Sequence, residues 1–120
     1  MASEIPTEIR LKKDRQTLVV TFDGGAGEIS LPAEYLRVES PSAEVQGHGP
    51  DEKKIVPGKK DVRISDVLPV GHYAVRLVFD DGHDTGIYTW DYLATLGAEH
   101  DKRWSAYLNA LSEKGQDRNG

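Results

Sequence analysis

The sequence contains no cysteine, and this absence excludes several kinds of chemistry. Disulfide bridges, thiolate zinc sites, cysteine-held iron–sulfur clusters and thiol nucleophiles all require that side chain. Disulfide frameworks are typical of secreted domains, so a chain without cysteine suits the cytoplasm, where we expect this protein to be located. Any metal site would have to use histidine and carboxylate ligands.

The chain also lacks an excess of basic residues and any long apolar run. It has 15 Lys and Arg against 20 Asp and Glu, a formal net charge of −5. That balance argues against binding of nucleic acid or of an anionic membrane, because both favour a basic surface. No segment approaches the length of a membrane span, and the first residues lack the pattern of a signal peptide. We therefore expect a soluble protein whose partner is neither nucleic acid nor membrane.

Recognisable catalytic motifs are missing as well. The sequence has no His-x-Asp/Glu, His-Glu-x-x-His, Gly-x-Ser-x-Gly or Walker motif, and the spacing of its Ser, His and Asp residues identifies no triad. The glycines at 24–27 lead into an expected strand rather than a helix, so they indicate a turn. We predict no catalytic residues, no cofactor and no enzymatic activity.

The clearest structural pattern lies in residues 67–97. Apolar side chains alternate through one segment and define one face of a strand: Tyr73, Val75, Leu77 and Phe79. Asp80-Asp81-Gly82 predicts a hairpin turn, and residues 83–88 the returning strand. Within that strand, Gly86 indicates a bulge or a close backbone approach.

Two helices are expected to follow this hairpin. Thr89 suits the N-cap of a short helix that would end at Gly97. Residues 98–114 have an apolar stripe at helical spacing, with Gly115 as a stop signal; the stripe consists of Trp104, Tyr107, Leu108 and Leu111. Packing on the core is the favoured role of this stripe, and binding of a partner is the alternative.

The first half of the chain predicts further short strands and one short helix. Alternating residues indicate strands at 9–11, 18–22 and 28–31, and Val62 and Ile64 mark another that leads into a connection over 66–71. Pro32 can begin a short helix. The predicted fold class is α+β: a small, mainly antiparallel sheet of hairpin strands, a short helix and a C-terminal amphipathic helix. We expect a flexible lead-in over 1–8, the domain over 9–97, the C-terminal helix over 98–115 and a disordered tail over 116–120.

Three segments of the sequence resemble the γ-butyrobetaine hydroxylase-like N-terminal domain family, also called DUF971. They are LRVESPSAE at 36–44, VGHYAV at 70–75 and FDDGHDTGIY at 79–88. The resemblance runs from about residue 9 to residue 97. It implies a domain that occurs alone in bacteria, at the start of Fe(II)/2-oxoglutarate hydroxylases, and fused to P-loop iron–sulfur carriers.

In the hydroxylases, the resemblance implies a structural zinc ion held by three cysteines and one histidine. The matching positions here are Ser40, Ser42, Val45 and His83. Serine and valine cannot replace thiolate ligands, so we expect no zinc at these positions. The oxygenase domain is also missing from the sequence, so hydroxylase activity is not expected.

Two functional hypotheses follow. The favoured one is a non-catalytic accessory module that docks on a protein partner in iron or iron–sulfur metabolism. The candidate docking residues are Arg37, His72, Asp81, His83 and Trp90, and maintenance of the fold is an equal alternative for them.

The second hypothesis is a metal-binding protein. It would use His83 with Asp81 or Asp84, and a second histidine, His48 or His72, brought near by folding. Clustered histidines would favour this hypothesis, whereas scattered histidines would count against it. A hydrogen-bonded turn residue is the competing interpretation of His83.

Overall fold

The computed structural model describes residues 5–23, 27–47 and 53–119, and these form two antiparallel sheets and several helices. The first sheet has the order β1 (Pro6–Leu11), β2 (Thr17–Phe22) and β3 (Glu28–Pro32). The second has the order β4 (Ile64–Val70), β5 (Ala74–Phe79) and β6 (Gly86–Thr89). The helices are α1 (Ala33–Val38), α2 (Ala43–Gln46), α3 (Trp90–Ala98) and α4 (His100–Glu113). The predicted α+β class is confirmed.

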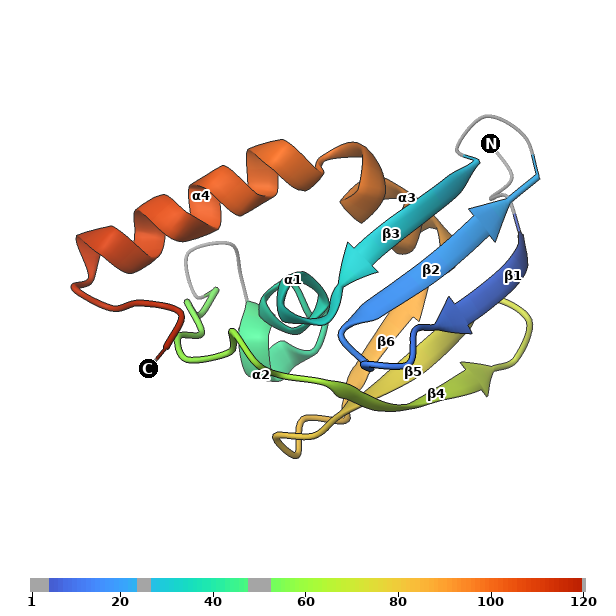
Figure 1. Ribbon diagram of the computed structural model, residues 1–120, viewed down its shortest axis with the longest axis horizontal. Coiled ribbons are helices and arrows are strands. Elements are labelled where there is room, and N and C mark those ends of the chain that lie inside the picture. Colours follow the sequence, from blue (N-terminus) through green and yellow to red (C-terminus); the bar gives the residue numbers. More distant parts are fainter. Residues whose placement is uncertain (1–4, 24–26, 48–52, 120) are drawn as a thin grey trace.

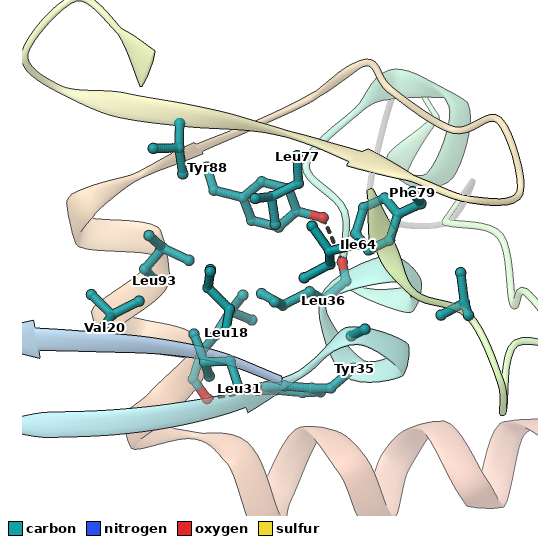
Figure 2. Close-up of a cluster of buried hydrophobic side chains, with 14 of the residues drawn as sticks. Leu18, Val20, Leu31, Tyr35, Leu36, Ile64, Leu77, Phe79, Tyr88 and Leu93 are labelled. Atoms are coloured by element: carbon teal, nitrogen blue, oxygen red, sulfur yellow. Dashed lines mark hydrogen bonds between the residues drawn. The ribbon is translucent and has the colours of Figure 1, made fainter. Parts of the chain in front are cut away.

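The hydrophobic core lies between the two sheets, which overlap in Figure 1 with β5 and β6 behind β2. Alternation along β2 and β5 supplies the facing side chains, which are Leu18, Val20 and Phe22 from β2 and Val75, Leu77 and Phe79 from β5. Leu36 of α1 and Leu93 of α3 extend the same cluster (Figure 2). Within the described residues, no helix has the length and apolar character needed to cross a bilayer.

Buried tyrosine hydroxyls hold α1 against its neighbours. Tyr88 of β6 donates a hydrogen bond to the carbonyl of Leu36 at 2.5 Å, visible in Figure 2. Tyr92 of α3 donates to the carbonyl of Glu39, also at 2.5 Å. Carbonyl groups at the end of a helix lack partners within that helix, so these bonds satisfy the end of α1 while fixing its position. The segment that follows α1 is thereby held near β6.

The structure corrects the expected connection over residues 66–71. Strand β4 continues to Val70 and pairs with β5 through a tight turn, in which Gly71 has a φ of 53°. This positive φ is readily adopted by glycine and allows the reversal. Tyr73 consequently lies in the turn with 57% of its surface exposed, so the prediction that it belongs to the same strand face as Val75, Leu77 and Phe79 was wrong.

The start of α3 was predicted and its end was not. Thr89 is the N-cap, and its hydroxyl accepts a hydrogen bond from the Tyr92 N–H at 3.1 Å. Gly97 lies within the helix, which ends at Ala98. A Cβ on Gly97 would approach the Ile29 side chain to 2.9 Å, so glycine allows α3 to pack closely on β3.

The C-terminal helix α4 covers the core less completely than its sequence pattern suggested. Tyr107 and Leu111 are buried, but Leu108 is 39% exposed, so the expected stripe is narrower than predicted. Gly115 ends the helix with a φ of 65°, as expected of a C-terminal glycine.

The chain termini differ from the expected lead-in and tail. Strand β1 begins at Pro6, inside the segment expected to be a loose lead-in. The segment expected to be a disordered tail contacts the body of the protein: the Gly58 and Lys60 N–H groups donate to the carbonyls of Asp117 and Arg118, both at 3.1 Å. The Arg118 guanidinium also binds the carboxylate of Glu34.

Candidate functional site

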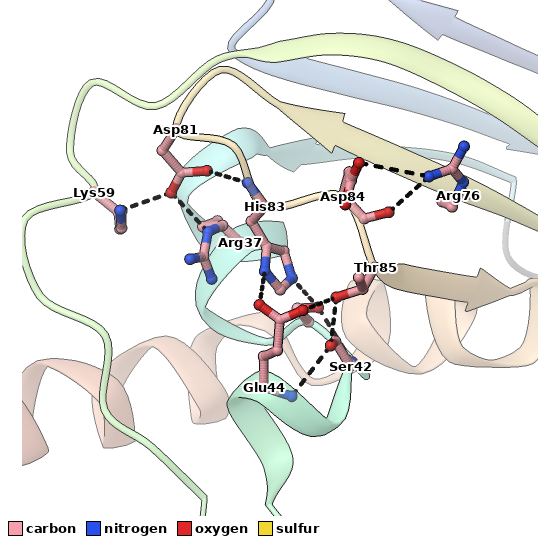
Figure 3. Close-up of polar contacts among 10 residues, drawn as sticks. Arg37, Ser42, Glu44, Lys59, Arg76, Asp81, His83, Asp84 and Thr85 are labelled. Atoms are coloured by element: carbon pink, nitrogen blue, oxygen red, sulfur yellow. Dashed lines mark hydrogen bonds and ion pairs between the residues drawn. The ribbon is translucent and has the colours of Figure 1, made fainter.

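A polar cluster joins the segment after α1 to the β5–β6 turn (Figure 3), with Ser40, Ser42 and His83 buried and Glu44 and Thr85 at its exposed edge. The Oγ atom of Ser40 lies 2.8 Å from Nε2 of His83. The hydroxyl of Thr85 donates to Oε2 of Glu44 at 2.6 Å and accepts from Ser42 at 2.7 Å. Residues about forty positions apart in the sequence are therefore held together by side-chain hydrogen bonds.

The donor set of this cluster does not fit the zinc ion that the resemblance implies. The hydroxyls of Ser40 and Ser42 form the hydrogen bonds just described. Val45 is buried, and its side chain has no atom that can bind a metal ion. Zinc in structural sites requires thiolate or imidazole ligands, and only His83 supplies one. The cluster is a hydrogen-bonded junction rather than a metal centre.

Gly86 allows the two segments to approach this closely. A Cβ at this position would lie 2.6 Å from the Oγ of Ser40 and 3.0 Å from the ring of Tyr88. Both distances are shorter than an ordinary van der Waals contact, so a side chain larger than hydrogen does not fit. The sequence predicted a bulge or a close backbone approach at Gly86, and the structure instead shows a close approach of side-chain atoms with no register shift in the β5–β6 pairing.

Ser40, His83 and Glu44 stand in the order of a nucleophile, a base and an orienting carboxylate. The distance from His83 Nδ1 to Glu44 Oε1 is 3.6 Å, which is longer than a hydrogen bond. Ser40 is fully buried, with 0% of its surface exposed, so a substrate cannot reach its Oγ in this conformation. The arrangement therefore stabilises the fold and does not provide an accessible nucleophile.

A second set of polar contacts, centred on the Asp81 carboxylate, lies beside this cluster. Its carboxylate contacts the Arg37 guanidinium at 2.8 Å and the Lys59 ammonium at 2.6 Å, and it accepts the His83 N–H at 3.1 Å (Figure 3). Burial alone would raise the pKa of Asp81, but the hydrogen bonds from Lys59, His83 and Arg37 lower it to about 2. Asp81 therefore remains ionised and anchors the turn.

The protonation of His83 is expected to couple folding to pH. Burial, and then repulsion by Arg37, lowers the pKa of His83 below its ordinary value of 6.5. In the unfolded chain His83 takes up a proton near pH 6.5, whereas in the folded chain it does so only at lower pH. The free energy of unfolding therefore decreases as the pH falls below 6.5. Chemical denaturation between about pH 7 and pH 5 should show this decline, which should be reduced in His83→Gln.

The control for that experiment is His72→Gln, because His72 is exposed in the β4–β5 turn. This variant should keep the decline of the wild type. An unchanged slope in His83→Gln would contradict a buried neutral His83.

Below about pH 4.5 a further decrease in the free energy of unfolding is expected. A hydrogen bond from Thr85 lowers the pKa of Glu44, and the pKa of Asp81 is lowered as described above, so both carboxylates resist protonation in the folded chain.

The five candidate docking residues do not share one surface. Arg37, Asp81 and His83 form the contacts described above, at the end of the sheet where β5 turns into β6. The other two lie at the opposite end, where the Trp90 indole donates to the carbonyl of His72 at 2.8 Å. The six residues of β5 separate the two ends by roughly 20 Å, at about 3.3 Å per residue.

The three histidines in the described residues are scattered in the same way. Among residues 5–23, 27–47 and 53–119, no three His, Cys, Asp or Glu side chains are grouped as metal ligands. His72 and His83 flank opposite ends of β5, and the ring of His100 lies against Tyr35 with centroids 4.8 Å apart. His48 lies outside the described residues.

The outer face of the β4–β5–β6 sheet is a feature that the sequence analysis missed. Pairing of β4 with β5 and of β5 with β6 places Arg76 opposite both Leu68 and Ile87. These residues alternate with buried core residues, so they point away from the core. The apolar members of this face are partly or largely exposed: Leu68, Val70, Val78 and Ile87. In the sequence, Asp66, Leu68 and Val70 occupy every second position, as residues on one face of a strand do, but this segment was interpreted as a connection.

Comparison with known proteins identifies the family. The model of the family described as "Gamma-butyrobetaine hydroxylase-like, N-terminal" matches residues 9–94, which is most of the chain. The chain belongs to this family. No match was found among curated proteins.

Solved structures support the assignment to the γ-butyrobetaine hydroxylase-like N-terminal family. One similar protein, solved by NMR in solution, has 46% sequence identity and a TM-score of 0.83, over 98% of this chain and 92% of that one. A crystal structure from Acidithiobacillus ferrooxidans, of a DUF971 family protein of unknown function, has 44% identity and a TM-score of 0.65. It covers 79% of this chain and 94% of that chain. The expected membership of the DUF971 family is therefore confirmed.

Proposed function

We propose that this protein is a non-catalytic interaction module that binds a partner protein through the outer face of the β4–β5–β6 sheet. The carrying observation is the apolar character of that face. An antiparallel sheet with one face in water usually has polar residues there, whereas this face has partly exposed Leu68, Val70 and Val78 and exposed Ile87 beside its polar Asp66, Arg76 and Thr89. A group of neighbouring apolar side chains that contact water on a folded protein is typical of a binding surface.

The earlier candidate residues fit this proposal only in part. Asp81 binds both the Arg37 guanidinium and the backbone N–H of His83, which favours the alternative that these residues maintain the fold. His72 and Trp90 flank the β4–β5 turn, at one end of the proposed surface. Exposed Tyr73 lies in the same turn and adds apolar area at that end.

The partner is proposed to act in iron-dependent or iron–sulfur metabolism. This part rests on the family, since the resemblance implies chains in which the domain accompanies iron-dependent hydroxylases and iron–sulfur carriers. An interaction module needs no catalytic residues of its own, and the same docking surface can serve different enzymes.

Capture of partners from cell extract tests the proposal. Ile87→Glu places a charge on the outer face and should abolish retention of proteins that the wild type retains. Leu108→Glu is the matched control, because Leu108 is 39% exposed on α4 and Ile87 is 42% exposed on β6. Both variants should remain folded, since both side chains already contact water.

Equal retention by Ile87→Glu and the wild type would contradict the proposed surface. Loss of retention in Leu108→Glu alone would indicate that the partner binds α4. Partner binding is the alternative role that the sequence analysis gave to the apolar stripe of this helix. Identification of the retained proteins by mass spectrometry tests the link to iron, and retention only of proteins unrelated to iron would contradict it.

A further inference from the structure

The outer strands of the two sheets differ in how their free edges are protected. Strand β1 has a register shift between Pro6 and Glu8, and β4 has one between Ile64 and Asp66. Such irregularities, with proline and charge, prevent an edge strand from pairing with another chain. Strand β3 is packed against α3 through the Ile29–Gly97 contact. Strand β6 has neither a register shift, a proline nor a charged residue.

The backbone of Ile87 is directed toward the free edge of β6. The N–H of Trp90 donates to the carbonyl of Tyr73 at 3.2 Å, which continues the β5–β6 pairing. In an antiparallel pair, bonded residues alternate with unbonded ones, so Tyr88 faces β5 and Ile87 faces away. As an unbonded member of the β5–β6 pairs, Ile87 has no backbone partner on β5, and among the described residues no turn, loop or cap bond involves its N–H or C=O. Buried backbone groups are almost always paired, so these groups are in contact with solvent.

Exposed carboxylates lie at both ends of this edge. Asp84 precedes β6, and Glu44 is bonded to Thr85 at the same end. Asp91 follows β6 in the first turn of α3. Basic side chains of a binding segment would therefore find an opposite charge at either end. A second copy of this chain fits less well, because antiparallel pairing of two β6 strands would bring Asp84 of one copy near Asp91 of the other.

We infer that β6 accepts an extended segment of the partner as a fourth strand of the β4–β5–β6 sheet. The segment has apolar, β-branched residues at its centre and Lys or Arg at its ends. Its backbone forms hydrogen bonds with the N–H and C=O groups of Ile87, and its central side chains contact the outer face. Its Lys or Arg side chains pair with Asp84 and Asp91. Strand addition of this kind derives affinity from backbone hydrogen bonds and specificity from alternate side chains. The inference rests on the proposed function and names the chemistry of the partner.

An NMR titration tests the edge directly. The full chain, labelled with ¹⁵N, is titrated with a synthetic peptide of alternating Val and Thr flanked by Lys, and separately with the same peptide flanked by Glu. We expect saturable shifts at the amides of Ile87 and Thr89, and slower hydrogen exchange at Ile87, with the Lys peptide only. Shifts confined to other elements, equal binding of both peptides, or no binding would overturn the inference.

Charge reversal gives a second readout with a matched control. Asp91→Lys should weaken binding of the Lys peptide by about two- to fivefold, the usual effect of one exposed ion pair. Asp101→Lys should leave it unchanged, since Asp101 occupies the first turn of α4 as Asp91 does that of α3. Equal effects of the two variants would overturn the role of Asp91. If the peptide fails to bind while Ile87→Glu still abolishes capture, the edge pairing is wrong and the proposed function stands.

Discussion

Replacement of Gly86 by alanine is expected to lower the free energy of unfolding by about 1–3 kcal/mol, the usual cost of overpacking a core. The added Cβ would lie 2.6 Å from the Oγ of Ser40, a buried atom bonded to His83. Tyr88 cannot retreat easily, because its hydroxyl is bonded to the carbonyl of Leu36. Urea denaturation of the wild type and of Gly86→Ala measures the difference.

A double-mutant cycle identifies the cause of this loss. Ser40→Ala removes the atom closest to the new methyl group, so Gly86→Ala should cost less in that background. Gly115→Ala is the control for a glycine in open space: a Cβ there has no neighbour within 4 Å, although its φ of 65° imposes a modest strain. Equal costs of Gly86→Ala with and without Ser40 would contradict the proposed steric conflict.

Arg118→Ala should also destabilise the protein, by about 1–3 kcal/mol. Glu34 is 6% exposed, and the Arg118 guanidinium binds its two carboxylate oxygens at 2.8 and 2.6 Å. Removing one partner of a buried ion pair costs about 3–5 kcal/mol, and the partial exposure of Arg118 reduces this figure. Denaturation at neutral pH, with tryptophan fluorescence as the probe, measures the loss.

Glu34→Gln in the Arg118→Ala background should recover part of that stability, because the unpaired charge is then removed. Arg76→Ala is the control. Its 3.8 Å contact with Asp84 joins two well-exposed side chains, and such pairs are worth less than about 1 kcal/mol. If Arg118→Ala cost no more than Arg76→Ala, residues 116–119 would have no role in holding Glu34.

Local chemistry in the sequence predicted the elements that depend on near neighbours. The alternation of apolar residues predicted which side chains of β5 are buried, and Thr89 predicted where α3 begins. The same reasoning failed at Gly97, because its role is to admit Ile29 from a distant strand. It also missed the β4–β5 hairpin, since adjacent apolar Val67 and Leu68 interrupt the polar–apolar alternation and Pro69 is unusual within a strand.

The candidate site was predictable only as a set of positions. The family resemblance singled out Ser40, Ser42 and His83, and folding does bring them into neighbouring contacts. Nothing in the spacing indicated that Glu44 and Thr85 would complete the cluster, because their bonds join segments 41 residues apart. The outer face of the second sheet was hidden for a similar reason: it is assembled from three strands, each with only one or two of its residues.

Photo-crosslinking from single positions tests the proposed docking surface most directly. A photoreactive amino acid is placed at Ile87 on β6 or at Leu108 on α4, two positions of similar exposure, and the protein is irradiated in cell extract. The proposed function predicts a discrete covalent adduct with a partner protein from position 87 and none from position 108. An adduct from position 108 alone, or no adduct from position 87, would contradict binding through the outer face of the β4–β5–β6 sheet.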